Sequence, residues 1–256
     1  SFIYTLSGVN TYTGATTING GTLLLSGSGS IASSSQVNVA NAASTFDIST
    51  TTAGATVTTL NGVAGSTVAL GNKTLTISNG STTFAGNFTS GIGALTVGAG
   101  TQTLSGANNF YFGPTTINGG TLALSGSGSI ASSSQVNVLG GTFDISATTA
   151  GSSITTLFGS GNVTLGNQTL TISNGSTPFA GSISGAGGGL TLTAGNQSLL
   201  GSNTYTGATT INGGTLALSG SGSVASSSQV NVANAAGTFD LSGATAGATV
   251  TTLNGV

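Results

Sequence analysis

The sequence contains no cysteine, histidine, methionine, tryptophan, glutamate or arginine. Without cysteine it has no disulfide framework. Without histidine, glutamate and arginine it lacks most of the side chains that activate nucleophiles or stabilise oxyanions. Its charged residues are Asp47, Asp144, Asp240 and Lys73, which make up 2% of the chain where about 25% is usual. We therefore expect no enzyme activity, no catalytic residue, no metal site and no cofactor.

The scarcity of charge also restricts the partners. With a formal net charge of −2, one lysine and no arginine, the chain lacks the clustered basic side chains that a nucleic-acid partner needs. Apolar runs such as Leu23–Leu25 are far shorter than the ~20 residues of a spanning helix, so we expect no transmembrane segment in this stretch. A net charge near zero favours association. We therefore predict self-association of the chain, end to end or laterally.

What the sequence does contain is a long repeat. Residues 16–39, 115–138 and 209–232 share the pattern TTINGGTL-x-LSGSGS-x-ASSSQVNV. Asp47 and Asp144 lie 97 residues apart, and Asp144 and Asp240 lie 96 apart. Self-similarity at a fixed long period is typical of a repeat architecture. We predict one continuous array over residues 1–256, with copies at about 1–100, 101–195 and a truncated 196–256. We expect it to be a window of a longer chain or a filament subunit.

Within each copy the apolar residues alternate, which predicts strands. Leu23 and Leu25 are kept from copy to copy, whereas position 24 changes from leucine to alanine, so we expect Leu23 and Leu25 to point inward. The same alternation holds for Val37 and Val39, Phe46 and Ile48, Leu75 and Ile77, and Leu95 and Val97. Asn-Gly pairs such as Asn61-Gly62 and Asn79-Gly80 predict corners with φ > 0. No segment has helical periodicity.

Two all-β architectures fit this pattern. In a parallel β-solenoid, also called a β-helix, each turn of about 20 residues pairs with the turns above and below, and one copy makes roughly five turns. Tandem β-sandwich domains of about 100 residues are the alternative, and the Asn-Gly pairs favour their hairpins. No linker separates the copies, and large side chains are too few for sandwich cores. We therefore predict the solenoid.

The segment LSGVNTYTGATTINGGTLLLSGSGSIA, residues 6–32, resembles the passenger-associated repeat of bacterial autotransporters. The pattern L-x-G-x-N-T-Y-x-G-x-T-x-I-x-x-G-T-L begins at Leu6 and returns at Leu199. The middle copy departs from it at Asn108-Asn109-Phe110-Tyr111 and at Pro114 but keeps the apolar pattern. The FDIS and LGNKTLTISNG segments resemble the linking sequence of such passengers, so the resemblance covers essentially the whole chain.

The resemblance implies a right-handed parallel β-helix that is exported and displayed on the surface of a Gram-negative bacterium. It implies an extracellular location, and it names no ligand. The family includes adhesins, aggregation factors and stalks that carry another domain. We therefore predict a structural protein, namely a stalk, fibre or sheath, with a possible part in aggregation or biofilm. The alternative is an adhesin that binds ligands of a host or of neighbouring cells along one face of the solenoid.

Aromatic residues recur around one corner of each copy. Tyr12, Phe110, Tyr111 and Tyr205 are the candidate ligand or partner contacts. In one interpretation these residues line a binding ridge. In the other they close a turn and shield the edges of strands.

Three further features have a functional and a structural interpretation. The segment Gly27–Ala32 matches the G-x-G-x-x-A dinucleotide pattern, but no helix is predicted after it, so a glycine-serine corner is favoured. Period two turns Asp47 outward, where we expect solvation or a local hydrogen bond rather than a calcium site. Lys73 is replaced by Gln168 in the next copy, which indicates a surface position.

Overall fold

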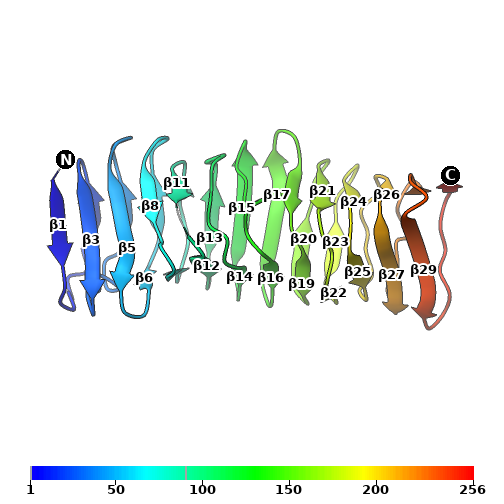
Figure 1. The fold of residues 1–256 in the computed structure, drawn as a ribbon, viewed down its shortest axis with the longest axis horizontal. Helices are drawn as coiled ribbons and strands as arrows, with labels where there is room; N and C mark the ends of the chain where they lie inside the picture. Colours follow the sequence, from blue (N-terminus) through cyan, green and yellow to red (C-terminus); the bar gives the residue numbers. More distant parts are fainter. Residues whose placement is uncertain (1, 90) are drawn as a thin grey trace. The chain divides into compact units, whose positions relative to one another are not determined.

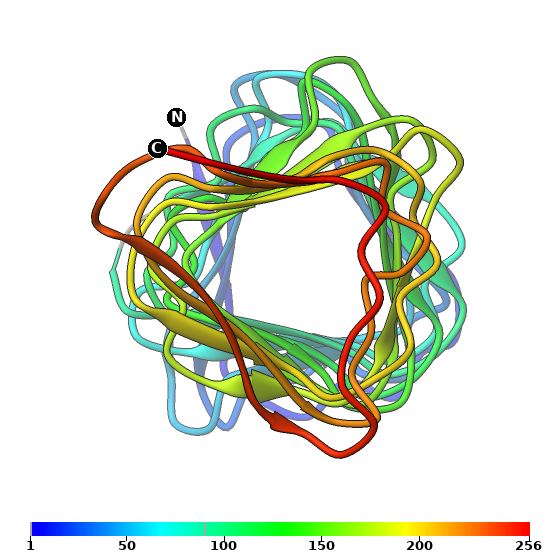
Figure 2. The same ribbon diagram turned by 90° about the vertical axis from the view of Figure 1, so that its right-hand side faces the viewer.

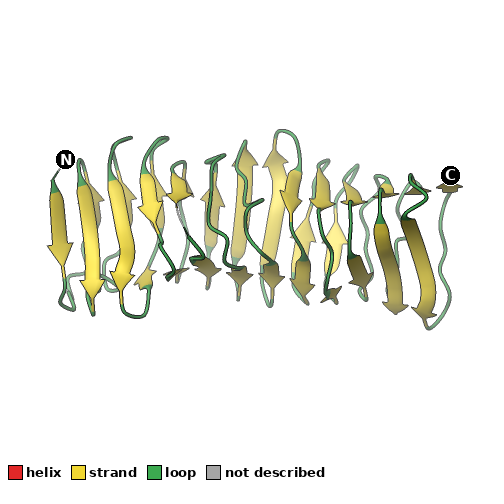
Figure 3. Cartoon of the chain, in the orientation of Figure 1, coloured by secondary structure: helices red, strands yellow, loops and turns green. Residues whose placement is uncertain are grey.

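The structure is a computed structural model, and it describes residues 2–89 and 91–256. The chain forms two compact units, unit one from residue 1 to 133 and unit two from 134 to 256. In the described residues all regular structure is β-strand, and no helix occurs (Figure 3). The strands of each unit pair only in parallel, as β3 and β5 do from Thr22 and Thr45 onward. Parallel coils confirm the β-solenoid and exclude the hairpins of tandem sandwiches.

Unit one contains strands from three parallel sheets, and successive coils add strands to the same sheets (Figure 1). Sheet 1a consists of β1 (Ile3–Leu6), β3 (Thr22–Gly27), β5 (Thr45–Thr51), β8 (Thr67–Ala69) and β11 (Asn87–Thr89). Sheet 1b consists of β2 (Thr16–Ile18), β4 (Val37–Val39), β7 (Leu60–Gly62), β10 (Thr83–Phe84), β13 (Thr101–Leu104) and β15 (Thr121–Gly126). Sheet 1c consists of β6 (Ala55–Val57), β9 (Thr74–Ile77), β12 (Ala94–Val97) and β14 (Thr115–Ile117).

Unit two is built in the same way. Sheet 2a consists of β18 (Ser152–Ile154), β21 (Thr169–Ile172), β24 (Gly189–Leu192), β26 (Thr209–Ile211), β28 (Val230–Val232) and β30 (Leu253–Gly255). Sheet 2b consists of β17 (Thr142–Thr148), β20 (Asn162–Thr164) and β23 (Ser182–Ser184). Sheet 2c consists of β16 (Val136–Val138), β19 (Leu157–Gly159), β22 (Pro178–Phe179), β25 (Asn196–Leu199), β27 (Gly214–Gly220) and β29 (Gly237–Ala244).

The coil of unit two is right-handed. In Figure 2 the last coil, in orange and red, runs counter-clockwise through β29 and β30 as it approaches the viewer. Coil length follows from the strand register, because paired residues lie one coil apart. Thr22 pairs with Thr45, whereas Ser152 pairs with Leu170, so the coils differ in length by a few residues. The spacings of these two pairs lie on either side of the turn length predicted from the sequence.

The predicted inward faces are confirmed. Leu25, Phe46 and Ile48 are fully buried, and Leu23 is nearly so, whereas Leu24 between the two leucines is only half-buried. The parallel register brings buried apolar side chains of successive coils together. Leu23 of β3, for example, pairs with Phe46 of β5. The hydrophobic core of each unit is therefore a set of apolar stacks along the coils, each stabilised by its nearest neighbours.

The Asn-Gly corners work differently from the prediction. Gly62 and Gly80 are absent from the glycines with φ > 0, which include Gly21 and Gly100 instead. Gly62 and Gly80 are sites of close packing. A Cβ at Gly62 would lie 2.6 Å from Cε2 of Phe84, and one at Gly80 would lie 2.7 Å from Cβ of Gln102. The prediction of φ > 0 was wrong at these two positions. Glycine is needed there because a side chain of the next coil leaves no room for a Cβ.

Equivalent strands of successive copies lie in different sheets. In unit one Thr22 lies in sheet 1a, while its equivalent Thr121 lies in sheet 1b. In unit two Val136 lies in sheet 2c, while its equivalent Val230 lies in sheet 2a. Along the chain of unit one the sheets follow in the order 1a, 1c, 1b, as β5, β6 and β7 show. One copy of the sequence repeat therefore does not make a whole number of coils. It ends one sheet before the fifth coil would be complete.

Candidate functional site

The corner that precedes β2, β14 and β26 has one pattern in all three copies, Asn-x-Tyr-x-Gly-x-Thr. The middle copy follows it as well, with Asn109 and Tyr111 in the places of Asn10 and Tyr12. It differs by one extra residue between Gly106 and Asn109, and at the x positions, where Phe110 and Phe112 replace threonines and Pro114 replaces alanine. The predicted departure of the middle copy is therefore an insertion of one residue together with these substitutions.

The asparagine of this corner joins three successive coils. The Phe88 N–H, in the preceding coil, donates to Oδ1 of Asn109 at 2.9 Å. Nδ2 of Asn109 donates to the Gly106 carbonyl of its own coil at 2.9 Å and to the Ser129 carbonyl of the next at 2.8 Å. The Asn109 side chain is only 3% exposed. A buried amide with these partners holds the coils in register because each lost partner leaves a desolvated polar group.

Unit two repeats the arrangement. The Ile183 N–H donates to Oδ1 of Asn203 at 2.9 Å. Nδ2 of Asn203 donates to the carbonyls of Gly201 and Ser223 at 3.0 and 2.9 Å. In the first coil Nδ2 of Asn10 makes the corresponding bonds to Gly8 and Ser30 at 2.9 and 3.1 Å. The asparagine is therefore a coil clamp in all three copies, and the sequence analysis did not single it out.

The tyrosine starts a chain of hydroxyls that also crosses to the next coil. The Tyr111 hydroxyl shares a hydrogen bond of 2.6 Å with Oγ1 of Thr115, which donates to Oγ of Ser133 at 2.9 Å. The Ser133 hydroxyl donates to the Gly113 carbonyl at 3.0 Å. Burial raises the pKa of Tyr111, and the smaller effect of the Thr115 hydrogen bond opposes it. The phenol therefore stays protonated at neutral pH and acts as a structural group.

The four predicted contact residues fall into two classes. Tyr111 and Tyr205 are buried, with 0% and 1% of their surface exposed, so neither offers a ligand any accessible area. Tyr12 and Phe110 are 42% and 53% exposed. Phe88 explains the burial of Tyr111, because the two rings meet edge to face with their centroids 5.7 Å apart. Contact with a partner stays a prediction for Tyr12 and Phe110.

The two corners of unit one do not form a common ridge. The corner of Tyr12 leads into β2 of sheet 1b, whereas the corner of Tyr111 leads into β14 of sheet 1c. A partner that touched both corners would have to contact two sides of the same coil stack. The geometry therefore favours separate contacts at each corner.

A buried glutamine is a second clamp that the sequence analysis missed. Nε2 of Gln102 donates to the carbonyls of Leu60 and Thr82 at 2.9 and 3.0 Å, which lie 42 and 20 residues earlier in the chain. Nε2 of Gln197 bonds in the same way to Leu157 and Thr177. One signal was present in the sequence. Gln102 stands two residues before the inward Leu104, so period two places its amide in the core.

The acidic residues make local bonds, as predicted. Oδ1 of Asp47 accepts a hydrogen bond of 2.8 Å from the Ser49 N–H, and Asp144 and Asp240 repeat the bond with Ser146 and Ser242. The Ser242 N–H lowers the pKa of the exposed Asp240 carboxyl. Nζ of Lys73 lies 3.4 Å from the Thr52 carbonyl at the surface. In residues 2–89 and 91–256 no three metal-binding side chains come together.

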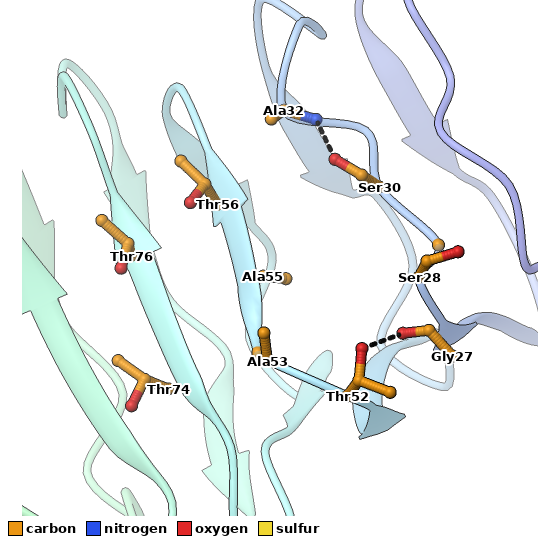
Figure 4. Close-up of a pocket in the computed structure, with 12 residues that line it drawn as sticks. Gly27, Ser28, Ser30, Ala32, Thr52, Ala53, Ala55, Thr56, Thr74 and Thr76 are labelled. Atoms are coloured by element: carbon orange, nitrogen blue, oxygen red, sulfur yellow. Dashed lines mark hydrogen bonds between the residues drawn. The ribbon is translucent and has the colours of Figure 1, made fainter.

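The glycine-serine corner at Gly27 lines an open groove of about 380 Å³ (Figure 4). Its walls are small residues of three coils, and Oγ1 of Thr52 donates to the Gly27 carbonyl across it at 3.0 Å. No helix follows Gly27, since residues 28–36 contain only turns, a bend, irregular backbone and a single β-bridge at Ser30. The groove therefore lacks the helix N-terminus that a dinucleotide site requires, and the corner interpretation holds.

Comparison with known proteins gives a family for three stretches. Residues 3–25, 97–124 and 184–218 match the passenger-associated-transport-repeat. No curated protein and no solved structure matches the chain. Over the described residues there is no helix long and apolar enough to cross a membrane. Each matched stretch contains one Asn-x-Tyr corner, and these matches confirm the predicted resemblance to the repeats of autotransporter passengers.

Proposed function

We propose that this chain is a structural part of an autotransporter passenger, displayed outside a Gram-negative cell as a stalk, fibre or sheath. The repeat matches and the parallel coils support the passenger assignment. On this proposal the chain works through length, stiffness and resistance to proteolysis, and it carries out no chemical step. Its copies at about 1–100, 101–195 and 196–256 form one array.

The observation that carries the proposal is the use of the repeat motif. The amides of Asn109 and Asn203 each bond three coils, and Tyr111 and Tyr205 are buried. A motif that bound a ligand would leave such groups accessible. Here the most regular residues of the sequence hold coil on coil, which is what a stiff solenoid needs because its stability is a sum of nearest-neighbour terms.

An adhesin is the second candidate, and one observation favours it. Ile92, Phe110 and Phe112 are large apolar side chains exposed by 72%, 53% and 55%. Exposed apolar groups of this kind mark interaction sites on soluble proteins. The two candidates differ in how they depend on these three residues. An adhesin that binds its partner through them loses binding when they are replaced by threonine, whereas a stalk keeps its function.

Electron microscopy with diffraction along the long axis tests the structural proposal. Parallel coils predict an axial repeat of about 4.8 Å. Long unbranched fibres with that repeat would support a self-assembling fibre. Rods of fixed length with the repeat would support a tethered stalk or adhesin. Deleting the chain from a displaying strain should shorten the surface layer seen by microscopy, and an unchanged layer would count against a stalk.

A further inference from the structure

The corner of Tyr111 carries exposed apolar side chains where the corners of Tyr12 and Tyr205 carry threonines. We define the Phe110 patch as Ile92, Phe110 and Phe112. Copy three has the exposed Thr204 and Thr206 at the two phenylalanine positions. The turn one coil before the corner of Tyr205, which corresponds to the turn of Ile92, contains Ala186 and Gly187. The patch is therefore specific to the corner of Tyr111.

The three side chains of the patch lie on adjacent coils. The Phe110 N–H donates to the Phe88 carbonyl at 2.9 Å, and the Phe112 N–H donates to the Gly91 carbonyl at 3.0 Å. The next hydrogen bond, from Gly113 to the Gly93 carbonyl, places Ile92 beside Phe112. Tyr111 points inward between the two phenylalanines, so both of these point out. The patch therefore spans two adjacent coils.

The fold itself does not require these residues. Unit two makes the same clamp with Asn203 and the same hydroxyl chain from Tyr205 to Thr209 and Ser227, with threonines on either side of the tyrosine. The phenylalanines therefore add nothing that the corner needs for its own packing. Keeping them exposed is unfavourable in water, because apolar surface that is not buried gains no hydrophobic stabilisation.

The chemistry around the patch favours the same patch on a second copy of the chain as its partner. Beside the patch, the Asn109 amide and the Tyr111 hydroxyl are bonded inside the coil, and Asn108 is an exposed, uncharged polar residue. Lys73 lies in the coil before Ile92, and its Nζ turns back to Thr52. A second copy brings the same uncharged apolar side chains, and almost no charge on the chain repels it.

We propose that the Phe110 patch is a lateral contact between two copies of this chain, paired about a twofold axis so that each patch covers the other. The proposal rests on the self-association predicted from the sequence and names its residues. Half-exposed phenylalanines offer on the order of 100 Å² each. The patch is thus smaller than the roughly 800 Å² per partner of a stable complex. A single contact is weak, and side-by-side chains on a surface multiply it.

The test is clustering of beads that display the whole chain at high density. The triple variant I92A/F110T/F112T takes residues like those of copy three, and its clustering should fall at least tenfold. The variant T204F/T206F builds phenylalanines onto the corner of copy three and should raise it. The control L139A/F158N removes two other exposed apolar side chains of the middle copy and should leave clustering unchanged. Thermal unfolding should be the same for all four proteins.

Three results would overturn the contact. These are wild-type beads that do not cluster, a triple variant that clusters like the wild type, and loss of clustering in L139A/F158N alone. Wild-type beads that bind only glycan-coated beads would also overturn it, and they would replace the second copy with a carbohydrate. The axial repeat of the triple variant separates the two proposals. A retained ~4.8 Å repeat with unchanged clustering removes only the patch, whereas a lost repeat counts against the solenoid itself.

Discussion

The first coil and the coil that holds Tyr111 contain the same corner in two different environments. Tyr12 and Tyr111 both bond the threonine four residues on, at 2.7 and 2.6 Å. Tyr12 is nevertheless 42% exposed and Tyr111 is fully buried. The difference is the neighbouring coil, since Phe88 packs against Tyr111 and its N–H bonds Asn109. The motif therefore fixes the hydrogen bonds, and the preceding coil supplies the burial.

This comparison shows how the stability of the array is distributed. A corner that lies between two coils makes bonds in both directions, whereas the corner of the first coil is bonded to the following coil, as Asn10 is to Ser30. The free energy of unfolding should therefore rise with each added neighbour and not with the motif alone. Substitutions at paired positions of the two corners can separate the two contributions.

The largest expected effect is the loss of the buried ring. Tyr111→Ala should lower the local free energy of unfolding by about 3–5 kcal/mol, because it leaves a cavity beside Phe88 and removes the partner of Thr115. In a protein of residues 1–256, Tyr12→Ala should cost only about 1 kcal/mol, since its ring is partly in water already. Hydrogen exchange of the amides of each coil measures both values. Equal losses at the two sites would break the comparison.

The asparagine clamp should give the next largest difference. Asn109→Ala leaves the Phe88 N–H and two carbonyls without their partner in a buried place, so we expect a loss of about 2–4 kcal/mol. In a protein of residues 1–256, Asn10→Ala should lose about 1 kcal/mol, because water reaches the corner of Tyr12 there and can replace the lost hydrogen bonds. Chemical denaturation of both variants provides the measurement.

Asn203→Ala serves as the matched control for the clamp, since Asn203 has the same three bonds in unit two. It should resemble Asn109→Ala within the error of the measurement. A loss at Asn203 as small as that at Asn10 would show that the preceding coil is not what stabilises the corner.

High pH should weaken the buried corners. Burial raises the pKa of Tyr111 and Tyr205 above the ordinary value of about 10. The folded state therefore keeps both protons at a pH where the unfolded state loses them. The free energy of unfolding is undiminished below about pH 10 and falls above it, by up to ~1.4 kcal/mol per pH unit for each tyrosine. The double variant Y111F/Y205F should flatten this fall in a series of melting curves, and an unchanged slope would assign it to other groups.

The sequence was sufficient to predict the direction of most side chains. Leu25, Phe46 and Ile48 face inward because period two is a property of the strand itself, and the copies showed which face varied. The local hydrogen bond of Asp47 was also predictable, since its partner Ser49 lies two residues along the same strand. Local rules succeed where the partner is local.

The sequence could not separate Tyr12 from Tyr205. Both stand in the same five residues, Asn-Thr-Tyr-Thr-Gly, and yet one is 42% exposed and the other 1%. Nothing within the motif carries this difference, because it depends on the neighbouring coil. Among the described residues a coil precedes the corner of Tyr205, whereas none precedes the corner of Tyr12. The sequence also could not predict which sheet the equivalent strands of each copy join. Coils of unequal length shift the register by small amounts, and the long sequence repeat does not reveal these shifts.

The smallest effect concerns the residue before the threonine of the corner, which is Pro114 in the middle copy and Ala208 in the third. Their carbonyls accept equivalent bonds, from the Leu95 N–H at 3.1 Å and from the Leu190 N–H at 3.0 Å. Among the backbone bonds of the described residues outside the strands, the Ala208 N–H donates none. Ala208→Pro should therefore be accommodated and should raise the free energy of unfolding by about 0.4–1 kcal/mol, because proline restricts the unfolded chain.

Pro114→Ala is the reciprocal change and should lower the free energy of unfolding by a similar amount. Calorimetric melting of the two variants and the wild type measures both. The two corners have nearly the same pattern of bonds, so opposite shifts of equal size would show that they also share one backbone conformation. A destabilised A208P protein would mean that the corner of the third copy has a different φ before its threonine. The likeness between copies would then extend to the hydrogen bonds but not to the backbone that carries them.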